Sequence, residues 1–253
     1  MKVQKTVALA LSGGGIRGVI HIGVLKAFEE SNIKIDAISG TSAGSIIGAL
    51  YCSGLSPLEI KEVVKHQNFK NSIHISFKPT GLATMKPLRK LLKTNINANS
   101  YELLKTKLFV CASNIDKAEF EIFSEGDLFS HVCASSSIPI IFEPVIINNM
   151  HYVDGGLFNN LPVEPLLNNY DTIIGVHVNN YKMPEKYNIK KIANQIFSMV
   201  IKQNVKRNME KCDYIINPVL EKPHRSFNKK NVDELYEIGY FTGLDFVEKH
   251  FNY

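Results

Sequence analysis

The sequence predicts an α/β fold in which a largely parallel or mixed sheet is covered by helices on both faces. Short, continuously apolar segments such as residues 6–11 have the length and composition of buried parallel strands. Longer segments with a helical apolar period, such as residues 18–30, 189–209 and 232–250, alternate with them. Such alternation is typical of α/β domains. With 253 residues and no linker-like stretch, we expect a single domain over residues 1–253.

The first third of the chain contains a second strand-to-helix connection and a well-marked helix start. Residues 37–39 are expected to form a strand, and the apolar residues 43–50 a helix directly after it. Ser56 is a good N-cap, Pro57 suits the first helical turn, and Glu59 completes a capping box. A further helix is therefore expected to begin at Ser56.

Later segments complete the alternation. Two pairs of short apolar segments flank polar turns and predict β-hairpins: residues 108–112 with 120–123, and residues 145–147 with 151–153. The remaining expected elements are a helix over 128–135 and strands over 172–178 and 214–216.

The segment Gly40-Thr41-Ser42-Ala43-Gly44 places a serine between two glycines at the predicted strand-to-helix junction. Small residues two positions before and after the serine allow a sharp turn that exposes its hydroxyl. A serine becomes nucleophilic only when a base accepts its proton and backbone donors stabilise the oxyanion. The N–H of Ala43 and the start of the next helix lie where that negative charge would develop.

Three successive glycines follow the first predicted strand. Gly13, Gly14 and Gly15 lack side chains, so their N–H groups are able to approach an anion closely. Arg17 and Gly18 complete this glycine-rich segment. We interpret it as an oxyanion hole.

A dinucleotide site is the alternative interpretation of these glycines. That motif requires an acidic residue at the end of the next strand. Asp36 has about the right separation, but it precedes residues 37–39, and Gly40 and Ser42 occupy the end of that strand. The nucleotide interpretation therefore remains a minor alternative.

The third segment is Asp154-Gly155-Gly156, at the end of the second predicted hairpin. Taken alone, an Asp-Gly pair is a common turn. Beside a serine elbow and a glycine loop, Asp154 becomes the leading candidate base. The neighbouring Tyr152 and Val153 favour burial, which should raise the basicity of the carboxylate.

Together these segments resemble the patatin-like phospholipase family: GGGIRG at 13–18, GTSAG at 40–44, DGG at 154–156 and the block at 134–139 before the aspartate. The resemblance implies a three-layer α/β/α fold with a central mostly parallel (mixed) sheet. On this basis the core motifs span residues 6–165, and C-terminal helices within residues 188–253 complete a layer.

The resemblance also implies hydrolysis of lipid acyl esters by a Ser-Asp dyad that needs no histidine and no cofactor. Ser42 is then the nucleophile and Asp154 the proton acceptor. Gly13, Gly14 and Gly15, with Ala43, would form the oxyanion hole. Residues that would support the motifs are Arg17, Gly18, Gly40, Gly44, Gly155 and Gly156. Arg17 has two candidate roles, contact with a lipid phosphate or bracing of the loop through a buried carboxylate.

Several alternatives stay open at this point. A Ser-His-Asp triad would take its histidine from His177, His224 or His250. His177 alternates along an apolar strand and is expected to be structural, whereas His224 and His250 have polar neighbours and are expected at the surface. Other functions compatible with the same motifs are acyl transfer to an acceptor alcohol and lipid binding without catalysis.

Composition narrows the remaining classes. The charge is +5, and basic residues cluster at 86–93 and 182–211. The ordinary interpretation is a solvated helix face, and the functional one is peripheral contact with an anionic membrane. No nucleic-acid motif accompanies the charge.

The cysteines and histidines give no sign of a disulfide framework or a metal site. The four cysteines are far apart, and the eight histidines form no metal motif. The sequence also contains no secretory signal and no run of about 20 apolar residues, so we expect a cytoplasmic protein.

Residues 66–100 are the least regular part of the chain, apart from a short helix expected after Pro87. They lie between the candidate nucleophile and the candidate base. We therefore hypothesise that this segment is a mobile cover over the active site.

Overall fold

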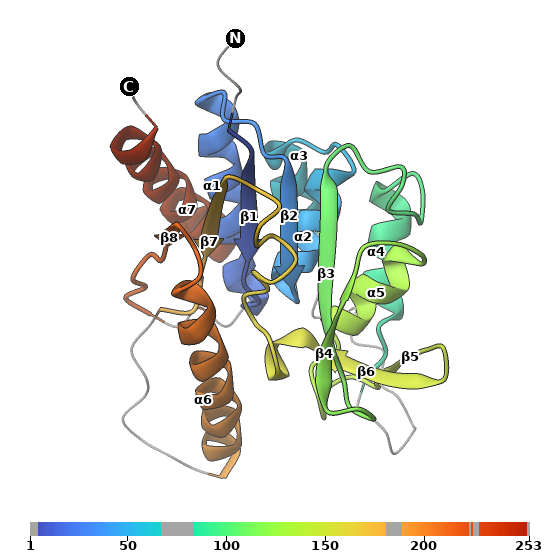
Figure 1. Cartoon of the computed structure of the whole chain (residues 1–253). Helices are drawn as coiled ribbons and strands as arrows, with labels where there is room; N and C mark the ends of the chain where they lie inside the picture. The colour runs from blue at the N-terminus through green and yellow to red at the C-terminus, as the bar shows by residue number, and fades with distance from the viewer. Residues whose placement is uncertain (1–4, 67–82, 181–188, 223, 225–227, 252–253) are drawn as a thin grey trace.

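A computed structural model describes residues 5–66, 83–180, 189–222, 224 and 228–251. Its sheet has the strand order β5-β6-β3-β2-β1-β7-β8, with β4 also paired to β3 (Figure 1). The strands are β1 (Val7–Leu11), β2 (Ala37–Thr41), β3 (Lys107–Asn114), β4 (Glu119–Phe123), β5 (Val145–Ile147), β6 (Met150–Asp154), β7 (Thr172–Val176) and β8 (Tyr214–Ile216).

Parallel and antiparallel pairs divide the sheet into two parts. The strands β3, β2, β1, β7 and β8 run parallel, whereas β4 and β6 both run antiparallel to β3, and β5 antiparallel to β6. The predicted mostly parallel, mixed sheet is therefore confirmed. Both predicted hairpins form, and the second one brings β6 alongside β3 so that Asp154 pairs with Ala112.

Helices cover both faces of the sheet. The α-helices are α1 (Val19–Glu30), α2 (Ala43–Cys52), α3 (Pro57–His66), α4 (Lys86–Asn95), α5 (Leu128–Ser135), α6 (Ile189–Met209) and α7 (Lys229–His250). The capping box predicted for α3 is present, since the Ser56 N–H donates to Glu59 Oε2 at 2.8 Å. The helix predicted over 232–250 begins earlier, at Lys229, because the Asn228 side chain caps it.

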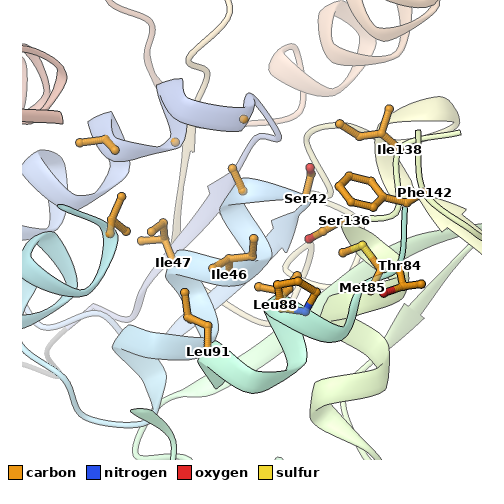
Figure 2. A pocket seen from close by; sticks show the side chains of 16 residues that line it. Ser42, Ile46, Ile47, Thr84, Met85, Leu88, Leu91, Ser136, Ile138 and Phe142 are labelled. Atoms are coloured by element: carbon orange, nitrogen blue, oxygen red, sulfur yellow. The ribbon is translucent and has the colours of Figure 1, made fainter. Parts of the chain in front are cut away.

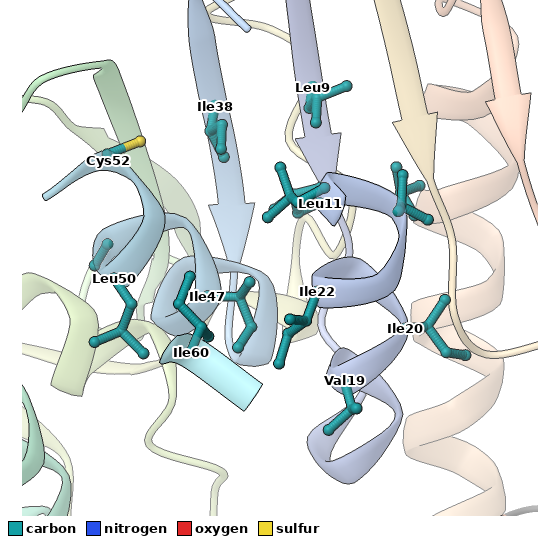
Figure 3. Close-up of a cluster of buried hydrophobic side chains, with 14 of the residues drawn as sticks. Leu9, Leu11, Val19, Ile20, Ile22, Ile38, Ile47, Leu50, Cys52 and Ile60 are labelled. Atoms are coloured by element: carbon teal, nitrogen blue, oxygen red, sulfur yellow. The ribbon is translucent and has the colours of Figure 1, made fainter. Parts of the chain in front are cut away.

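Alternate residues of the central strand β1 enter different cores. Leu9 and Leu11 pack with Ile22 of α1 and Ile47 of α2 in the larger hydrophobic core (Figure 3). Ala8 and Ala10 point to the other face, where a second core contains Val205 of α6. This period-two pattern buries the strand completely and places both helix layers against it. The three-layer arrangement follows from these two cores.

Within the ranges given above, no helix combines the length and the apolar character needed to cross a bilayer. The hypothesis of a mobile cover falls partly on residues 67–82, which lie outside the described residues. The part that is described, α4, forms a wall of the site described below.

Candidate active site

Ser42 sits on a strained turn between β2 and α2. Its φ is 53° and its ψ is −121°, a left-handed conformation that non-glycine residues adopt infrequently. Glycines make this turn feasible: a Cβ on Gly40 would lie 2.6 Å from the Gly44 carbonyl carbon, and one on Gly44 would lie 2.2 Å from the Leu11 oxygen. The predicted strand-turn-helix elbow is therefore the local structure.

Hydrogen bonds hold the elbow from both sides. The Ser42 N–H donates to Ser135 Oγ at 2.9 Å, and the Ser42 carbonyl accepts from Ser45 Oγ at 2.7 Å. The hydroxyl of Thr41 donates to the carbonyl of Asn159 at 2.8 Å. The strained conformation is thus fixed by contacts from α2, α5 and the turn after β6.

Asp154 ends β6 and is buried, with 4% of its surface exposed. Its N–H donates to the Ser137 carbonyl at 2.8 Å, and its Oδ1 accepts the Gly156 N–H at 2.8 Å. Burial raises the pKa of its carboxyl to about 6, although hydrogen bonding to the Ser42 side chain and to the Gly156 N–H opposes this shift. The Ser42 hydroxyl and the Asp154 carboxyl therefore face each other. The expected increase in basicity is present.

The glycine loop packs directly on Ser42. A Cβ on Gly13 would lie 3.0 Å from Ser42 Cβ, so only glycine fits there without displacement. The Gly13 N–H donates to the Asn160 carbonyl at 3.2 Å and is already engaged. Among the described residues, the N–H groups of Gly14, Gly15 and Ala43 donate to no backbone carbonyl outside their own helices.

Arg17 braces the loop through an amide. Its Nε donates to Asn179 Oδ1 at 2.9 Å, and Asn179 Nδ2 donates to the Gly13 carbonyl at 2.6 Å. Of the two roles considered for Arg17, these hydrogen bonds support bracing of the loop, here through the side-chain amide of Asn179. This contact does not test a phosphate role.

The sequence analysis missed a buried asparagine that joins the glycine loop to the aspartate turn. Asn160 is 2% exposed, and its Nδ2 donates to the Gly13 carbonyl at 3.4 Å. Its Oδ1 would lie 2.5 Å from a Cβ on Gly13 and 2.9 Å from one on Gly156. Its N–H donates to Asn204 Oδ1 at 3.0 Å, and Asn204 Nδ2 donates to the Gly156 carbonyl at 3.1 Å. Asn160 therefore fills the space between the two segments.

A second asparagine anchors the same turn to α6. Asn159 Nδ2 donates to Glu164 at 2.6 Å, and the buried Asn208 donates to Asn159 Oδ1 at 2.9 Å. Lys211 also pairs with Glu164 at 3.0 Å. One sequence signal could have identified these two asparagines. They form an Asn-Asn pair directly before the apolar Leu161, in a segment whose other residues are typical of the hydrophobic core.

An apolar cavity of about 210 Å³ opens beside Ser42. Figure 2 shows Ser42 at one end and Leu91 at the other, with Ile46, Ile47 and Leu88 between them. The walls come from α1, α2, α3, α4 and the segment after α5, and no lining side chain is charged. Such a cavity suits an acyl chain, since its walls offer apolar contact along its length.

The three histidines considered for a Ser-His-Asp triad are buried or partly buried in contacts of their own. His177 is buried, as expected for a structural residue, and burial lowers its pKa to about 4. His224 was expected at the surface, and this prediction was wrong: it is 6% exposed because it packs against α7, where Nε2 lies 3.1 Å from Glu234 Oε1. His250 is partly buried against the rings of Tyr214 and Phe246.

Two other candidate sites can be compared with the structure. Asp36, the acidic residue required by the nucleotide interpretation, accepts the Val7 N–H at 2.9 Å, at the start of β1 and so at the opposite end of that strand from the glycine loop. This position does not suit a ribose contact beside Gly13. Among the described side chains, no three His, Cys, Asp or Glu residues gather as metal ligands would.

The model of the family described as patatin-like phospholipase matches residues 9–167, which include all three motifs. This chain belongs to the patatin-like phospholipase family. The fold and the order of its glycine loop, serine elbow and aspartate turn are those of a patatin-like domain. The resemblance drawn from the sequence is thereby confirmed.

Curated relatives are longer proteins. The chain is 26% identical over 280 aligned residues to the lysophospholipase nte1 of Aspergillus fumigatus, covering 97% of this chain and 18% of that protein. It is 29% identical over 168 residues to the lysophospholipase NTE1 of Yarrowia lipolytica, covering 64% and 12% respectively. This patatin-like chain therefore spans less than a fifth of the length of these relatives.

Solved structures share the fold. VipD from Legionella pneumophila aligns with a TM-score of 0.61 at 15% identity, covering 98% of this chain and 67% of that one. ExoU, in its heterodimeric complex with SpcU from Pseudomonas aeruginosa, aligns with a TM-score of 0.55 at 16% identity, covering 97% and 52%. At these identities the likeness concerns the fold alone.

Proposed function

We propose that this patatin-like chain is a serine hydrolase that cleaves carboxylic ester bonds of phospholipids, lysophospholipids or related lipids through Ser42 and Asp154. The observation that carries the proposal is the buried Asp154 carboxyl, which faces a strained serine elbow beside an uncharged cavity. The names of the curated lysophospholipases support the choice of lipid esters. The cavity supports an acyl chain as the group that is bound.

The reaction is a two-step acyl transfer. Ser42 Oγ attacks the ester carbonyl carbon while Asp154 accepts the hydroxyl proton. The N–H groups of Gly14, Gly15 and Ala43 stabilise the tetrahedral oxyanion. The C–O bond to the alcohol breaks, and the alcohol leaves with the proton from Asp154. Water then attacks the acyl-enzyme, Asp154 accepts a proton from it, and the fatty acid leaves as Ser42 recovers its hydroxyl proton.

The carboxylate is a suitable base because of its burial. A free aspartate has a pKa of about 3.9 and accepts protons poorly near neutral pH. A base works best when its pKa is close to the working pH. A pKa of about 6 brings Asp154 nearer to that range. The engaged Gly156 N–H fixes the direction of Oδ1.

The test is a lipid panel assayed with wild-type protein, Ser42→Ala and Asp154→Asn, with products identified by mass spectrometry. We expect Ser42→Ala to be inactive and Asp154→Asn to lose about 10³-fold in kcat, within the range for a general base. Asp245→Asn, an exposed aspartate of α7, is the matched control and should resemble wild type.

Three further measurements separate the alternatives. A His177→Ala protein as inactive as Ser42→Ala would contradict the dyad and favour a triad. Product analysis with an added acceptor alcohol distinguishes acyl transfer from hydrolysis. Failure of a fluorophosphonate to label Ser42 in the wild-type protein would indicate a lipid-binding protein without catalysis.

A further inference from the structure

The rim segment, residues 138–142, connects the cavity to solvent with apolar side chains. Ile138 and Phe142 line the cavity near Ser42 (Figure 2). Between them, Ile140 is 80% exposed and Ile141 is 45% exposed. A single exposed apolar side chain is unremarkable, but these two continue the apolar lining outward from the cavity.

The backbone holds Ile140 in this exposed position. Its φ is 73°, a left-handed value that is unfavourable for a β-branched residue. Glycine or asparagine would adopt the same φ with less strain. The chain therefore presents a large apolar side chain to solvent at a position where both local strain and exposure oppose it.

The rim segment is closed on itself and tied to α4. The Phe142 N–H donates to the Ile138 carbonyl at 2.9 Å, which folds the segment into a short loop. Phe142 also forms an isolated parallel bridge with Ala83, and the Glu143 N–H donates to the Ala83 carbonyl at 2.9 Å. The helix α4 begins three residues after Ala83. The rim segment and the start of α4 are therefore neighbours.

The outer face of α4 is basic. Lys86, Lys90 and Lys93 are exposed and recur at helical spacing, opposite the apolar face that lines the cavity. None of the three has an ion-pair partner among the described residues, whereas Arg89 pairs with Asp127 at 3.2 Å. A cationic face beside apolar tips is complementary to an anionic lipid surface, where each lysine contributes about 1 kcal/mol.

We propose that the rim segment and the lysine face of α4 dock on an anionic bilayer, with Ile140 and Ile141 entering the boundary between headgroups and acyl chains. An acyl chain then passes along Ile138 and Phe142 into the cavity. This inference rests on the proposed function, because docking would serve to deliver lipid esters to Ser42. The exposed apolar surface of two isoleucine side chains is small compared with the roughly 1,200 Å² that a stable protein interface buries. This difference favours a lipid surface over a protein partner.

The direct test uses tryptophan fluorescence, because the chain contains no tryptophan. Ile140→Trp is made in the Ser42→Ala protein, so no lipid is consumed. The matched control is Leu103→Trp, which is 70% exposed and precedes β3, at the end of the sheet opposite to Ser42. Both proteins are mixed with phosphatidylcholine vesicles, with or without phosphatidylglycerol.

We expect a blue shift of the Ile140→Trp emission with the anionic vesicles, a smaller shift with neutral ones, and no shift for Leu103→Trp. Replacing Lys86 and Lys90 by glutamine should weaken the vesicle affinity by about 30-fold, as expected from two lysines. Equal shifts at the two positions, or no shift at Ile140→Trp, would overturn the proposal. The absence of a shift is also the result expected if this surface binds a protein and not a lipid bilayer.

An activity measurement separates docking from catalysis. Ile140→Asn suits the positive φ, so we expect it to fold at least as stably as wild type. Its hydrolysis of vesicle phospholipid should fall about tenfold, while its hydrolysis of a soluble short-chain ester stays at the wild-type rate. Equal losses on both substrates would contradict docking. If the wild type hydrolyses neither, the proposed function fails, whereas the fluorescence result stands independently.

Discussion

The Ser42–Asp154 end and the apolar wall of the site border the same cavity but are held by different forces. Ser42 and Asp154 are buried, and hydrogen bonds to other segments hold their backbones, from the Ser42 N–H to Ser135 Oγ and from the Asp154 N–H to the Ser137 carbonyl. Along α4 and the rim segment, the side chains that line the cavity are apolar, and others such as Ile140 reach solvent. Directional bonds fix the positions of Ser42 and Asp154, whereas apolar surfaces accept chains of varied shape. The division suggests that chemistry and substrate selection can be altered separately.

Asp154→Asn tests whether burial of the Asp154 carboxylate lowers the stability of the fold, and we expect the largest effect here. The folded pKa lies above the unfolded value, so the protonated carboxyl stabilises the fold at low pH, and this stability is lost as the pH rises through about 6. Removing the charge should stabilise the protein at pH 8 by about 3 kcal/mol, from a shift of about two pKa units. Below about pH 4 the difference should vanish.

The measurement is thermal or urea unfolding of both proteins between pH 4 and pH 8, with Asp245→Asn as the exposed control. A stability difference that is the same at every pH would show that Asp154 does not carry a buried charge.

Asn160→Ala tests the polar framework itself. Loss of this side chain removes one of the two amide donors to the Gly13 carbonyl, leaving Asn179, and opens a space between the glycine loop and the Asp154 turn. Because small displacements of reacting groups are costly, we expect kcat to fall about 10²-fold with KM nearly unchanged. Asn169→Ala, at an exposed asparagine, should retain wild-type kinetics. A rise in KM at constant kcat would instead place Asn160 in substrate binding.

Ile46→Trp tests the apolar wall and should have a smaller, substrate-dependent effect. The larger ring would fill part of the cavity between Ser42 and Leu91. We expect kcat/KM for long acyl chains to fall about tenfold relative to short ones, a usual scale for a few methylene contacts. The measurement is an ester series of increasing chain length, with Ile115→Trp as the exposed control. Uniform loss over the series would contradict a separate role for the wall.

Local sequence determined most of the secondary structure and the identity of the motifs. The predicted helices over 128–135 and 189–209 and the strand over 214–216 have the observed boundaries, because apolar period and capping residues act over a few positions. The strand predicted over 172–178 ends earlier, at Val176, because the sheet ladder with β8 ends there. Strand ends depend on a partner that the segment itself does not encode.

Tertiary structure decided what lies between the motifs. The left-handed backbone of Ser42, the burial that raises the pKa of Asp154, and the place of Asn160 each depend on contacts between segments far apart in the chain. The prediction that His224 lies at the surface was wrong for the same reason, because the helix α7 buries it. Periodicity and turn chemistry are local properties of the sequence, whereas burial and electrostatic environment exist only after distant elements have packed.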